Sequence, residues 1–285
     1  MALVTLTDVL GKARGAEYGI PAFNVNNLEF IQGVMQAAEE LRSPVILAIA
    51  PRAIAHAGLE ALAALGRLQA QHASIPVVVH LDHGKDLDAV RQSLALGFSS
   101  VMYDGSGLSI EENIQQTRKV VEMARRTGAS VEGEIGTMLA HGDRADEDLT
   151  LERLRQFFTR PEEARRYVDE TGVDALAVSV GTVHGMPIKT ARIDQERLRA
   201  IHQAVPTPLV FHGCTGLQDE EYRAAYTLGV KKFNIGTHLG EAFAQGLAVE
   251  AQGGKGALVC LQAGREAVYE AAKGRIAVLN SAGKA

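Results

Sequence analysis

Three histidines, each followed directly by a glycine, stand where short apolar segments of the chain end. Neutral imidazole is a good ligand for Zn²⁺, and three protein ligands that leave a fourth position open are typical of a catalytic zinc site. A lone histidine is usually a packing or surface residue, but three in one context predict a single metal site. The predicted ligands are His83, His184 and His212; packing or surface roles are expected for His56, His72, His80, His141, His202 and His238.

An aspartate directly precedes the first of these histidines. Near a dication the carboxylate of Asp82 is expected to be ionised, and it could act as a general acid or base or orient a neighbouring ligand. Side chains alternate between the two faces of a regular strand, which would point Asp82 and His83 in opposite directions. Both therefore reach one cavity only if the chain bends here, as Gly84 permits.

Further carboxylates stand at the ends of two other apolar segments, at Asp104, Glu132 and Glu134. The spacing of the two glutamates places them on the same face of a strand. Buried carboxylates need partners, and a metal ion, a lysine or substrate hydroxyl groups would serve.

Two later segments that contain glycine are suited to bind an anion. Each offers backbone N–H groups and a hydroxyl, and the second directly precedes an expected helix, whose N-terminus favours negative charge. Together they predict a phosphate cradle in the seventh and eighth loops of a barrel, although each alone would be only a turn. Lys189 would add a positive charge. The cradle residues are Gly213, Cys214, Thr215 and Gly216, with Asn234, Ile235, Gly236 and Thr237.

The elements that would carry these residues alternate between strand-like and helix-like patterns. Eight strands separated by helices predict an α/β fold, a closed (β/α)₈ TIM barrel, in which chemistry lies at the carboxyl ends of the strands. An open doubly wound sheet is disfavoured because no glycine-rich dinucleotide turn follows the first strand. Strands are expected at 18–25, 44–50, 76–81, 99–103, 130–135, 174–180, 208–211 and 231–235, and helices at 28–41, 59–73, 86–96, 110–126, 194–204, 219–228 and 239–250.

No linker divides the chain, so residues 1–285 are expected to form one domain. Residues 136–160 break the alternation, because they carry many charges and no clear strand pattern. A βα loop of this length after the fifth strand would be either a functional lid or a solvated insertion.

The composition excludes several classes of function. Of the 285 residues, 46% are hydrophobic and 22% charged, which indicates a large buried core rather than disorder. The net charge of −5 argues against general binding to nucleic acid or an anionic membrane, and no apolar run is long enough to span a bilayer. Two cysteines are too few for a disulfide framework and, without a signal-peptide pattern at the N-terminus, indicate a reducing cytoplasm.

The motifs, in this order, resemble the class II, zinc-dependent ketose-bisphosphate aldolases, a family that includes fructose- and tagatose-1,6-bisphosphate aldolases. The resemblance covers nearly the whole chain. It rests on residues 21–26, 80–84, 131–136, 181–185, 212–216, 234–237, 274–276 and 281–284.

The resemblance implies a (β/α)₈ fold with a catalytic Zn²⁺ on the three histidines, and Asp82 as the proton donor to the aldehyde oxygen in the condensation direction. Asp104 and Glu134 match positions that hold an alternative or second divalent ion, and the carbonyls of Gly185 and Gly213 match a site for Na⁺ or K⁺. A homodimer or homotetramer is implied as well. Gly185, Gly213, Thr215, Asn234 and Thr237 match positions that bind dihydroxyacetone phosphate, and substrate contacts are also expected from Asn24, Lys189, Cys214, Ile235 and Gly236.

The chain departs from the family pattern at two functional places. An Asp-Pro-Arg segment usually sends an arginine to the second phosphate in a neighbouring subunit, whereas glycine-rich residues 253–260 stand here. The loop after the fifth strand usually carries a glutamate that removes the substrate proton, whereas residues 139–143 read Leu-Ala-His-Gly-Asp. The candidates to replace that glutamate, none of them singled out by the sequence, are His141, Asp143, Asp146 and Glu147.

The function implied by the resemblance is the reversible, glycolytic cleavage of fructose 1,6-bisphosphate to dihydroxyacetone phosphate and glyceraldehyde 3-phosphate, without a Schiff-base lysine. Tagatose 1,6-bisphosphate is the alternative, favoured by the short segment between Gly216 and Asn234. A product aldehyde without the distal phosphate is a third option, because the arginine is missing. The rival from another class is a non-catalytic descendant that binds zinc or a sugar phosphate.

Overall fold

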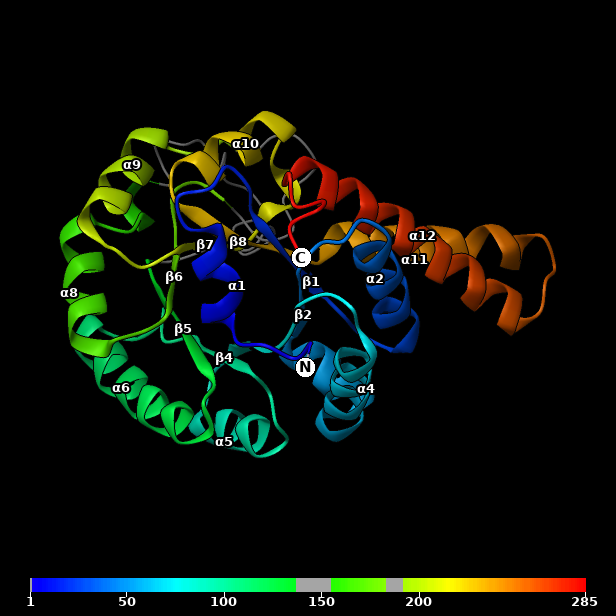
Figure 1. Ribbon diagram of the computed structural model, residues 1–285, viewed down its shortest axis with the longest axis horizontal. Coiled ribbons are helices and arrows are strands. Elements are labelled where there is room, and N and C mark those ends of the chain that lie inside the picture. Colours follow the sequence, from blue (N-terminus) through cyan, green and yellow to red (C-terminus); the bar gives the residue numbers. More distant parts are fainter. Residues whose placement is uncertain (1, 137–154, 183–191) are drawn as a thin grey trace.

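The computed structural model describes residues 2–136, 155–182 and 192–285, which contain eight parallel strands closed into one barrel. The strands pair in sequence order and the first pairs with the last, which confirms the predicted (β/α)₈ fold (Figure 1). The strands are β1 (Ile20–Asn24), β2 (Val45–Ile49), β3 (Val77–Gly84), β4 (Ser100–Tyr103), β5 (Ser130–Ile135), β6 (Ala175–Val178), β7 (Leu209–Phe211) and β8 (Val230–Ile235).

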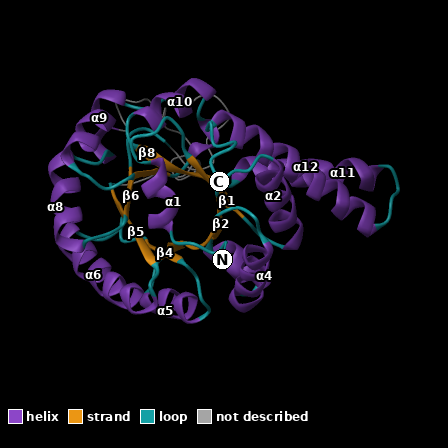
Figure 2. Ribbon diagram, in the orientation of Figure 1, coloured by secondary structure: helices purple, strands orange, loops and turns teal. Residues whose placement is uncertain are grey.

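Helices form a ring outside the strands (Figure 2). Some of them begin and end at caps that the sequence offers, and α6 (Ile110–Thr127) is an example. Ser109 and Glu112 form a capping box at its start, and Gly128 ends it in the left-handed conformation. The helices that follow the strands are α2 (Leu28–Glu40), α4 (Leu59–His72), α5 (Leu87–Ala95), α6 (Ile110–Thr127), α8 (Pro161–Thr171), α9 (Gln195–Ala204), α10 (Asp219–Thr227) and α11 (Thr237–Gln252).

The structure contains several elements that the sequence analysis did not predict, and α1 (Leu6–Ala13) is the most informative of them. It lies across the N-terminal end of the barrel and closes it (Figure 1). Its apolar residues Leu6 and Leu10 share a buried cluster with Ile46 and Val78 of β2 and β3. The other unexpected elements are α3 (Pro51–Ala57), α8, α12 (Ala257–Val278) and the 3₁₀ helices Arg155–Phe157 and Cys214–Gly216.

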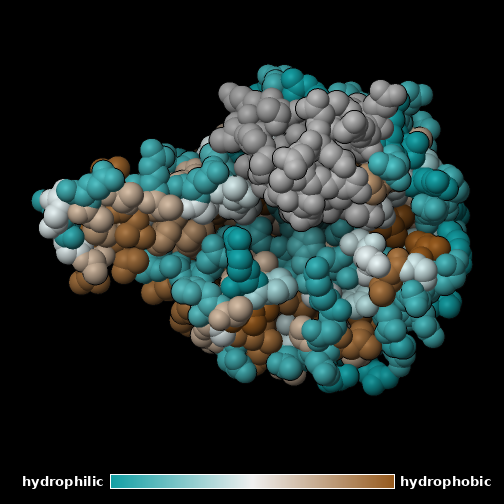
Figure 3. Space-filling view, turned by 180° about the vertical axis from the view of Figure 1, so that it is seen from behind, coloured by the Kyte–Doolittle hydropathy of each residue, from teal (hydrophilic) through white to brown (hydrophobic). Residues whose placement is uncertain are grey.

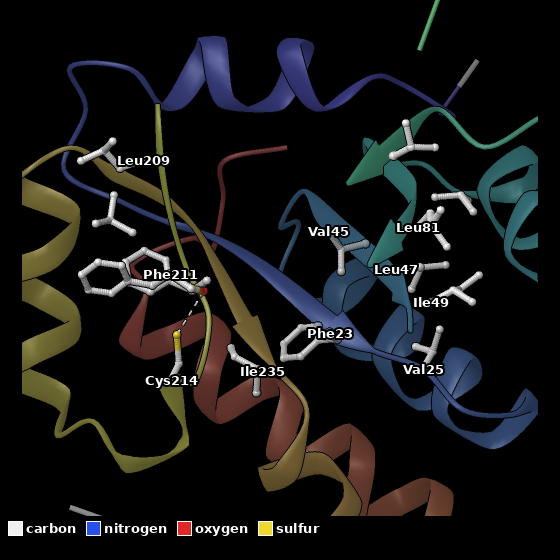
Figure 4. Packing of buried hydrophobic residues seen from close by; sticks show 14 of the residues in the cluster. Phe23, Val25, Val45, Leu47, Ile49, Leu81, Leu209, Phe211, Cys214 and Ile235 are labelled. Atoms are coloured by element: carbon white, nitrogen blue, oxygen red, sulfur yellow. Dashed lines mark hydrogen bonds between the residues drawn. The ribbon is translucent and has the colours of Figure 1, made fainter. Parts of the chain in front are cut away.

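Side chains of each strand alternate between the surrounding helices and the barrel interior. Figure 4 shows side chains that face the helices, among them Phe23 and Leu47 of the main apolar core. The inward positions of β3 change from Val78 through His80 to Asp82, and all three are buried. The interior is therefore apolar beneath α1 and polar at the opposite end, where the strands finish.

The last two helices form a hairpin that projects from the barrel (Figure 1). α11 and α12 are joined by residues 253–256, and α12 packs back against α2. Within the described residues, no helix is both long enough and apolar enough to cross a bilayer. Of the expected long segment at 136–160, residues 137–154 lie outside the described part of the chain.

Candidate active site

The end of β3 brings two candidate site residues, Asp82 and His83, to one place. The strand is irregular between Leu81 and Gly84, and the backbone of His83 has a φ of 50°. This left-handed conformation is uncommon for a residue with a Cβ, and it turns His83 to the same side as Asp82. The bend was expected at Gly84, but the positive φ lies one residue earlier. Gly84 serves close packing instead, because a Cβ there would lie 2.7 Å from the carbonyl oxygen of Met102 on β4.

Two of the predicted metal ligands meet across the barrel. His212 follows β7 directly, and its Nδ1 lies 3.0 Å from Nε2 of His83. On its other side, Nε2 of His212 lies 2.8 Å from Oε1 of Glu132. The carboxylate thus accepts the Nε2 proton and leaves a lone pair on Nδ1, facing His83. Burial, reinforced by the charge of His83, lowers the pKa of His212.

A second group of donors surrounds the other face of His83. Its Nδ1 lies 3.0 Å from Oδ2 of Asp104 and 3.9 Å from Oε2 of Glu134. Burial alone would lower the pKa of His83, but the neighbouring carboxylates, Asp82 above all, raise it to about 9. Burial raises the pKa of Glu134 to about 8, and its Oε2 has no hydrogen-bond partner among the described residues.

The donor set fits a metal ion. Two groups of three side chains bring nitrogen and oxygen ligand atoms within 4.8 Å of one another, and His83 belongs to both. Imidazole nitrogen and carboxylate oxygen are ligands that Zn²⁺ accepts, and the buried Glu134 oxygen, which has no hydrogen-bond partner among the described residues, is the kind of atom that a cation would satisfy. The third predicted ligand, His184, lies outside the described residues. The two groups are Asp82, His83 and His212, and His83, Asp104 and Glu134.

Asp82 is held by two amide groups. Nδ2 of Asn24, at the end of β1, donates to its Oδ2 over 2.6 Å, and Nδ2 of Asn234 on β8 donates to its Oδ1 over 2.9 Å. Burial alone would raise the pKa of Asp82. The positive charges of His83 and of a buried lysine outweigh burial and hold the pKa of Asp82 well below its usual range.

That lysine, Lys232, is part of a buried network that the sequence analysis did not identify. Its Nζ lies 2.8 Å from Oε2 of Glu132 and 2.6 Å from Oδ1 of Asn234, and the side chain is fully buried. His80 is buried beside it, with Nδ1 2.8 Å from the hydroxyl of Ser100, and burial lowers its pKa to about 3. The spacing of the sequence could have identified Lys232, because it precedes Asn234 by two residues and must lie on the same face of the strand.

The expected phosphate cradle is positioned partly as the sequence suggests. Gly213 has a φ of 65° and leads into a 3₁₀ helix, and α11 begins at Thr237 with Gly236 as its N-cap residue. The side chains of Cys214 and Ile235 lie in the apolar core, where Sγ of Cys214 contacts the carbonyl of Phe211 (Figure 4).

A substrate contact of Cys214 or Ile235 would therefore come from the backbone, as expected for a cradle of N–H groups. Asn24 lies beside the cradle, because a Cβ on Gly236 would lie 2.8 Å from its Oδ1. Gly185 and Lys189 lie outside the described residues, as does the loop with the candidate proton-abstracting groups.

Comparison with known proteins shows the fold and the family of this chain. The structure of the YdjI aldolase from Escherichia coli K12 is 31% identical in sequence, with a TM-score of 0.86 and coverage of 99% of this chain and 99% of that chain. Fructose-bisphosphate aldolase from Campylobacter jejuni, at 23% identity, has a TM-score of 0.84 over 100% of this chain and 97% of its own, and shares the fold. Residues 4–284 match the family of class II fructose-bisphosphate aldolases. With its barrel and its paired strand-end histidines, this chain belongs to that family.

Proposed function

We propose that the protein is a zinc-dependent aldolase that reversibly cleaves a phosphorylated ketose into dihydroxyacetone phosphate and an aldehyde. The observation that carries the proposal is the meeting of Asp82, His83 and His212 at the carboxyl end of the barrel, with the two imidazole nitrogens 3.0 Å apart. Two elements that are distant in sequence, the end of β3 and the residue after β7, converge there. A structural role alone would not require ligand atoms to face one another in this way.

Zn²⁺ on His83 and His212, with His184 as the expected third ligand, would polarise the ketone and stabilise the negative charge that develops as the carbon–carbon bond breaks. Asp82 would move the proton. Its low pKa keeps it ionised at neutral pH, so in the cleavage direction it would accept the proton of the C4 hydroxyl. In the condensation direction the same carboxyl group would return that proton to the aldehyde oxygen.

The contacts of Lys232 argue against a Schiff-base mechanism. A lysine inside the barrel would be the natural candidate for attack on the ketone. Here its Nζ is engaged by Glu132 and Asn234 and is fully buried, so it supports the site from beneath. Borohydride added with substrate is therefore expected to leave activity intact, whereas a chelator abolishes it.

Fructose 1,6-bisphosphate is the first substrate to test, and tagatose 1,6-bisphosphate is the second. The support for the first is membership of the family. Fructose 1-phosphate is the third, because residues 253–256, at the tip of the α11–α12 hairpin, provide no arginine for a second phosphate. A second divalent ion on His83, Asp104 and Glu134 belongs to the same proposal.

The deciding experiment is a cleavage assay of the zinc-loaded protein on these three sugars side by side, with His83→Ala as the control. Cleavage of one sugar, lost in the variant and after chelation, is the expected result and identifies the substrate. Full activity after removal of the metal would overturn the mechanism. Zinc binding with no cleavage of any of the three would favour the non-catalytic sugar-phosphate binder.

A further inference from the structure

A second concave site lies at the opposite end of the barrel from the strand-end histidines. It is a cavity of about 570 Å³, formed where the chain enters β1, β7 and β8. Its walls come from residues 14–17 before β1, from the end of α9 with residues 205–208, and from the end of α10 with Gly229 and Lys231. Nothing in the proposed aldol reaction uses this end of the molecule.

The wall of this cavity is rich in cationic side chains. Arg14, Arg165, His202 and Lys231 line it, and Glu17 is the single acidic residue among the lining residues. Arg165 already pairs with Asp169, with a distance of 2.6 Å between Nε and Oδ2. Neither Arg14 nor Lys231 takes part in an ion pair with any described residue. The cavity therefore holds an excess of positive charge.

Lys231 is the most unusual of these groups. The residue is only 5% exposed, and its Nζ donates to the carbonyl oxygens of Ala16, over 2.6 Å, and Tyr226, over 2.8 Å. An ammonium group has three N–H donors, so two carbonyls leave one donor to be satisfied. Burial lowers the pKa of Lys231 to about 8, and the negative charge of Glu17 acts in the opposite direction.

His202 lies close enough to Lys231 and Arg14 to be affected by their positive charges. Its ring packs against the backbone of Gly229, where a Cβ would lie 2.2 Å from Nδ1. Burial lowers the pKa of His202, and the charges of Lys231 and Arg14 lower it further. Three potential cations thus act on one small volume. A bound anion would compensate this charge, whereas an empty cavity leaves a nearly buried ammonium without a full counter-charge.

We propose that this cavity binds a phosphate group, either as free phosphate or as the head of a small phosphate ester, at a site separate from the active site. Lys231 and Arg14 are the principal contacts. The guanidinium of Arg14 offers paired N–H donors that match phosphate oxygens, and the remaining N–H of Lys231 meets them from the cavity wall. The proposal is independent of the aldolase assignment, since none of these residues belongs to the candidate active site.

The test must separate this cavity from the catalytic end, which is itself expected to bind phosphate. The imidazole of His202 provides a local probe, observed by NMR in the zinc-loaded protein and assigned by the loss of its signal in His202→Gln. Inorganic phosphate is expected to shift this signal saturably and to raise the pKa of His202, because a dianion counters the nearby positive charges. Glycerol 2-phosphate, as a second ligand, shows whether the cavity also takes an organic group.

Two exposed arginines make a matched pair of variants. Arg14→Gln is expected to weaken the phosphate response of His202 about tenfold or more, as the loss of a charge-assisted hydrogen bond requires. Arg199→Gln, on the same helix as His202 but outside the cavity, is expected to keep the wild-type response. The proposal is overturned if phosphate leaves the His202 signal unmoved, or if both variants respond as the wild type does.

Discussion

At the scale of single residues, the buried polar groups form a chain of contacts that leads to the proposed metal ligands. Lys232 contacts Glu132, Glu132 contacts His212, and His212 faces His83. Each contact decides the state of the next group. The lysine compensates the charge of the carboxylate, and the carboxylate selects the tautomer of the histidine. The chemistry of the site therefore depends on residues that would not touch a substrate.

Glu132→Gln tests this dependence. A neutral amide holds the His212 proton less strongly and leaves the Lys232 charge uncompensated, so zinc affinity is expected to fall about 10–100-fold. Competition with a chelator of known affinity measures it. Glu196→Gln, on the exposed first turn of α9, is the control and should leave affinity unchanged. Equal zinc affinity in wild type and Glu132→Gln would show that the contact does not tune the ligand.

Asp82→Asn separates proton transfer from metal binding. The side chain keeps its size but no longer accepts a proton, so kcat for cleavage is expected to fall about 10²–10⁴-fold. The imidazole ligands remain, so the purified variant should still contain zinc. Steady-state kinetics together with metal analysis provide both readouts. A variant that binds zinc and cleaves at the wild-type rate would remove Asp82 from the mechanism.

The lowered pKa of Lys231 predicts that the free energy of unfolding depends on pH. Its pKa is lowered from 10.5 to about 8 in the folded protein, so between these values the unfolded chain binds a proton that the folded chain has released. Its contribution to the free energy of unfolding therefore rises from pH 8 to 10.5, with a slope of up to about 1.4 kcal/mol per pH unit. The measurement is the difference between wild type and Lys231→Met in phosphate-free urea titrations. A difference that stays constant over this range would refute the shift.

At the scale of elements, the end of β3 depends on close packing against β4. His83 adopts a left-handed backbone conformation, and the next residue must pass close to the carbonyl of Met102. A side chain on Gly84 would also meet Cδ2 of Leu81 at 2.8 Å. The carbonyl belongs to the neighbouring strand, so relief would require the two strands to separate.

Gly84→Ala is expected to lower the free energy of unfolding by about 1–3 kcal/mol, as overpacking of a core usually does, and to weaken zinc binding by displacing His83. Gly274→Ala, in α12 where a Cβ would meet no atom within 4 Å, is the matched control. It should be neutral or stabilise the protein by up to about 1 kcal/mol. Denaturant unfolding and zinc affinity decide the outcome, and equal effects of the two substitutions would contradict this account of the bend.

At the scale of the whole molecule, the α11–α12 hairpin projects away from the barrel, so the barrel does not bury its side chains. Leu239 is the only residue of α11 that is buried. Figure 3 shows hydrophobic side chains along the projecting hairpin, and exposed apolar residues there include Val249, Leu258 and Val259, with Leu258 76% exposed. Contiguous apolar surface of this kind usually marks an interaction site.

We expect the hairpin to mediate self-association of the chain, and Leu258→Glu to shift a dimer or tetramer toward the monomer. A charge at this position must be desolvated in an interface but is harmless in water. Sedimentation velocity measures the change. Leu68→Glu is the control, because Leu68 is 47% exposed on α4, away from the hairpin. A wild-type monomer, or an oligomer that both substitutions leave intact, would contradict this expectation.

The sequence by itself determined the barrel, because the alternation of buried strands and amphipathic helices allows few other arrangements. It also determined which residues stand at strand ends, including Asp82, His83 and His212, since parallel strands bring their carboxyl ends to one side. It missed α1 because an eight-residue amphipathic segment carries little periodic signal, and its role depends on an opening that exists only once the barrel closes.

Only the tertiary structure decided how the site is held. The contacts from Lys232 to Glu132 and from Asn24 and Asn234 to Asp82 join strands that are distant in sequence, and no local pattern specifies which partners meet inside a barrel. The bend of β3, which the sequence predicted at Gly84, lies at His83 in the tertiary structure, where packing overrides the backbone preference of the residue. Residue type and spacing fix which groups reach the barrel interior, and three-dimensional packing fixes which partner, charge and conformation each group has there.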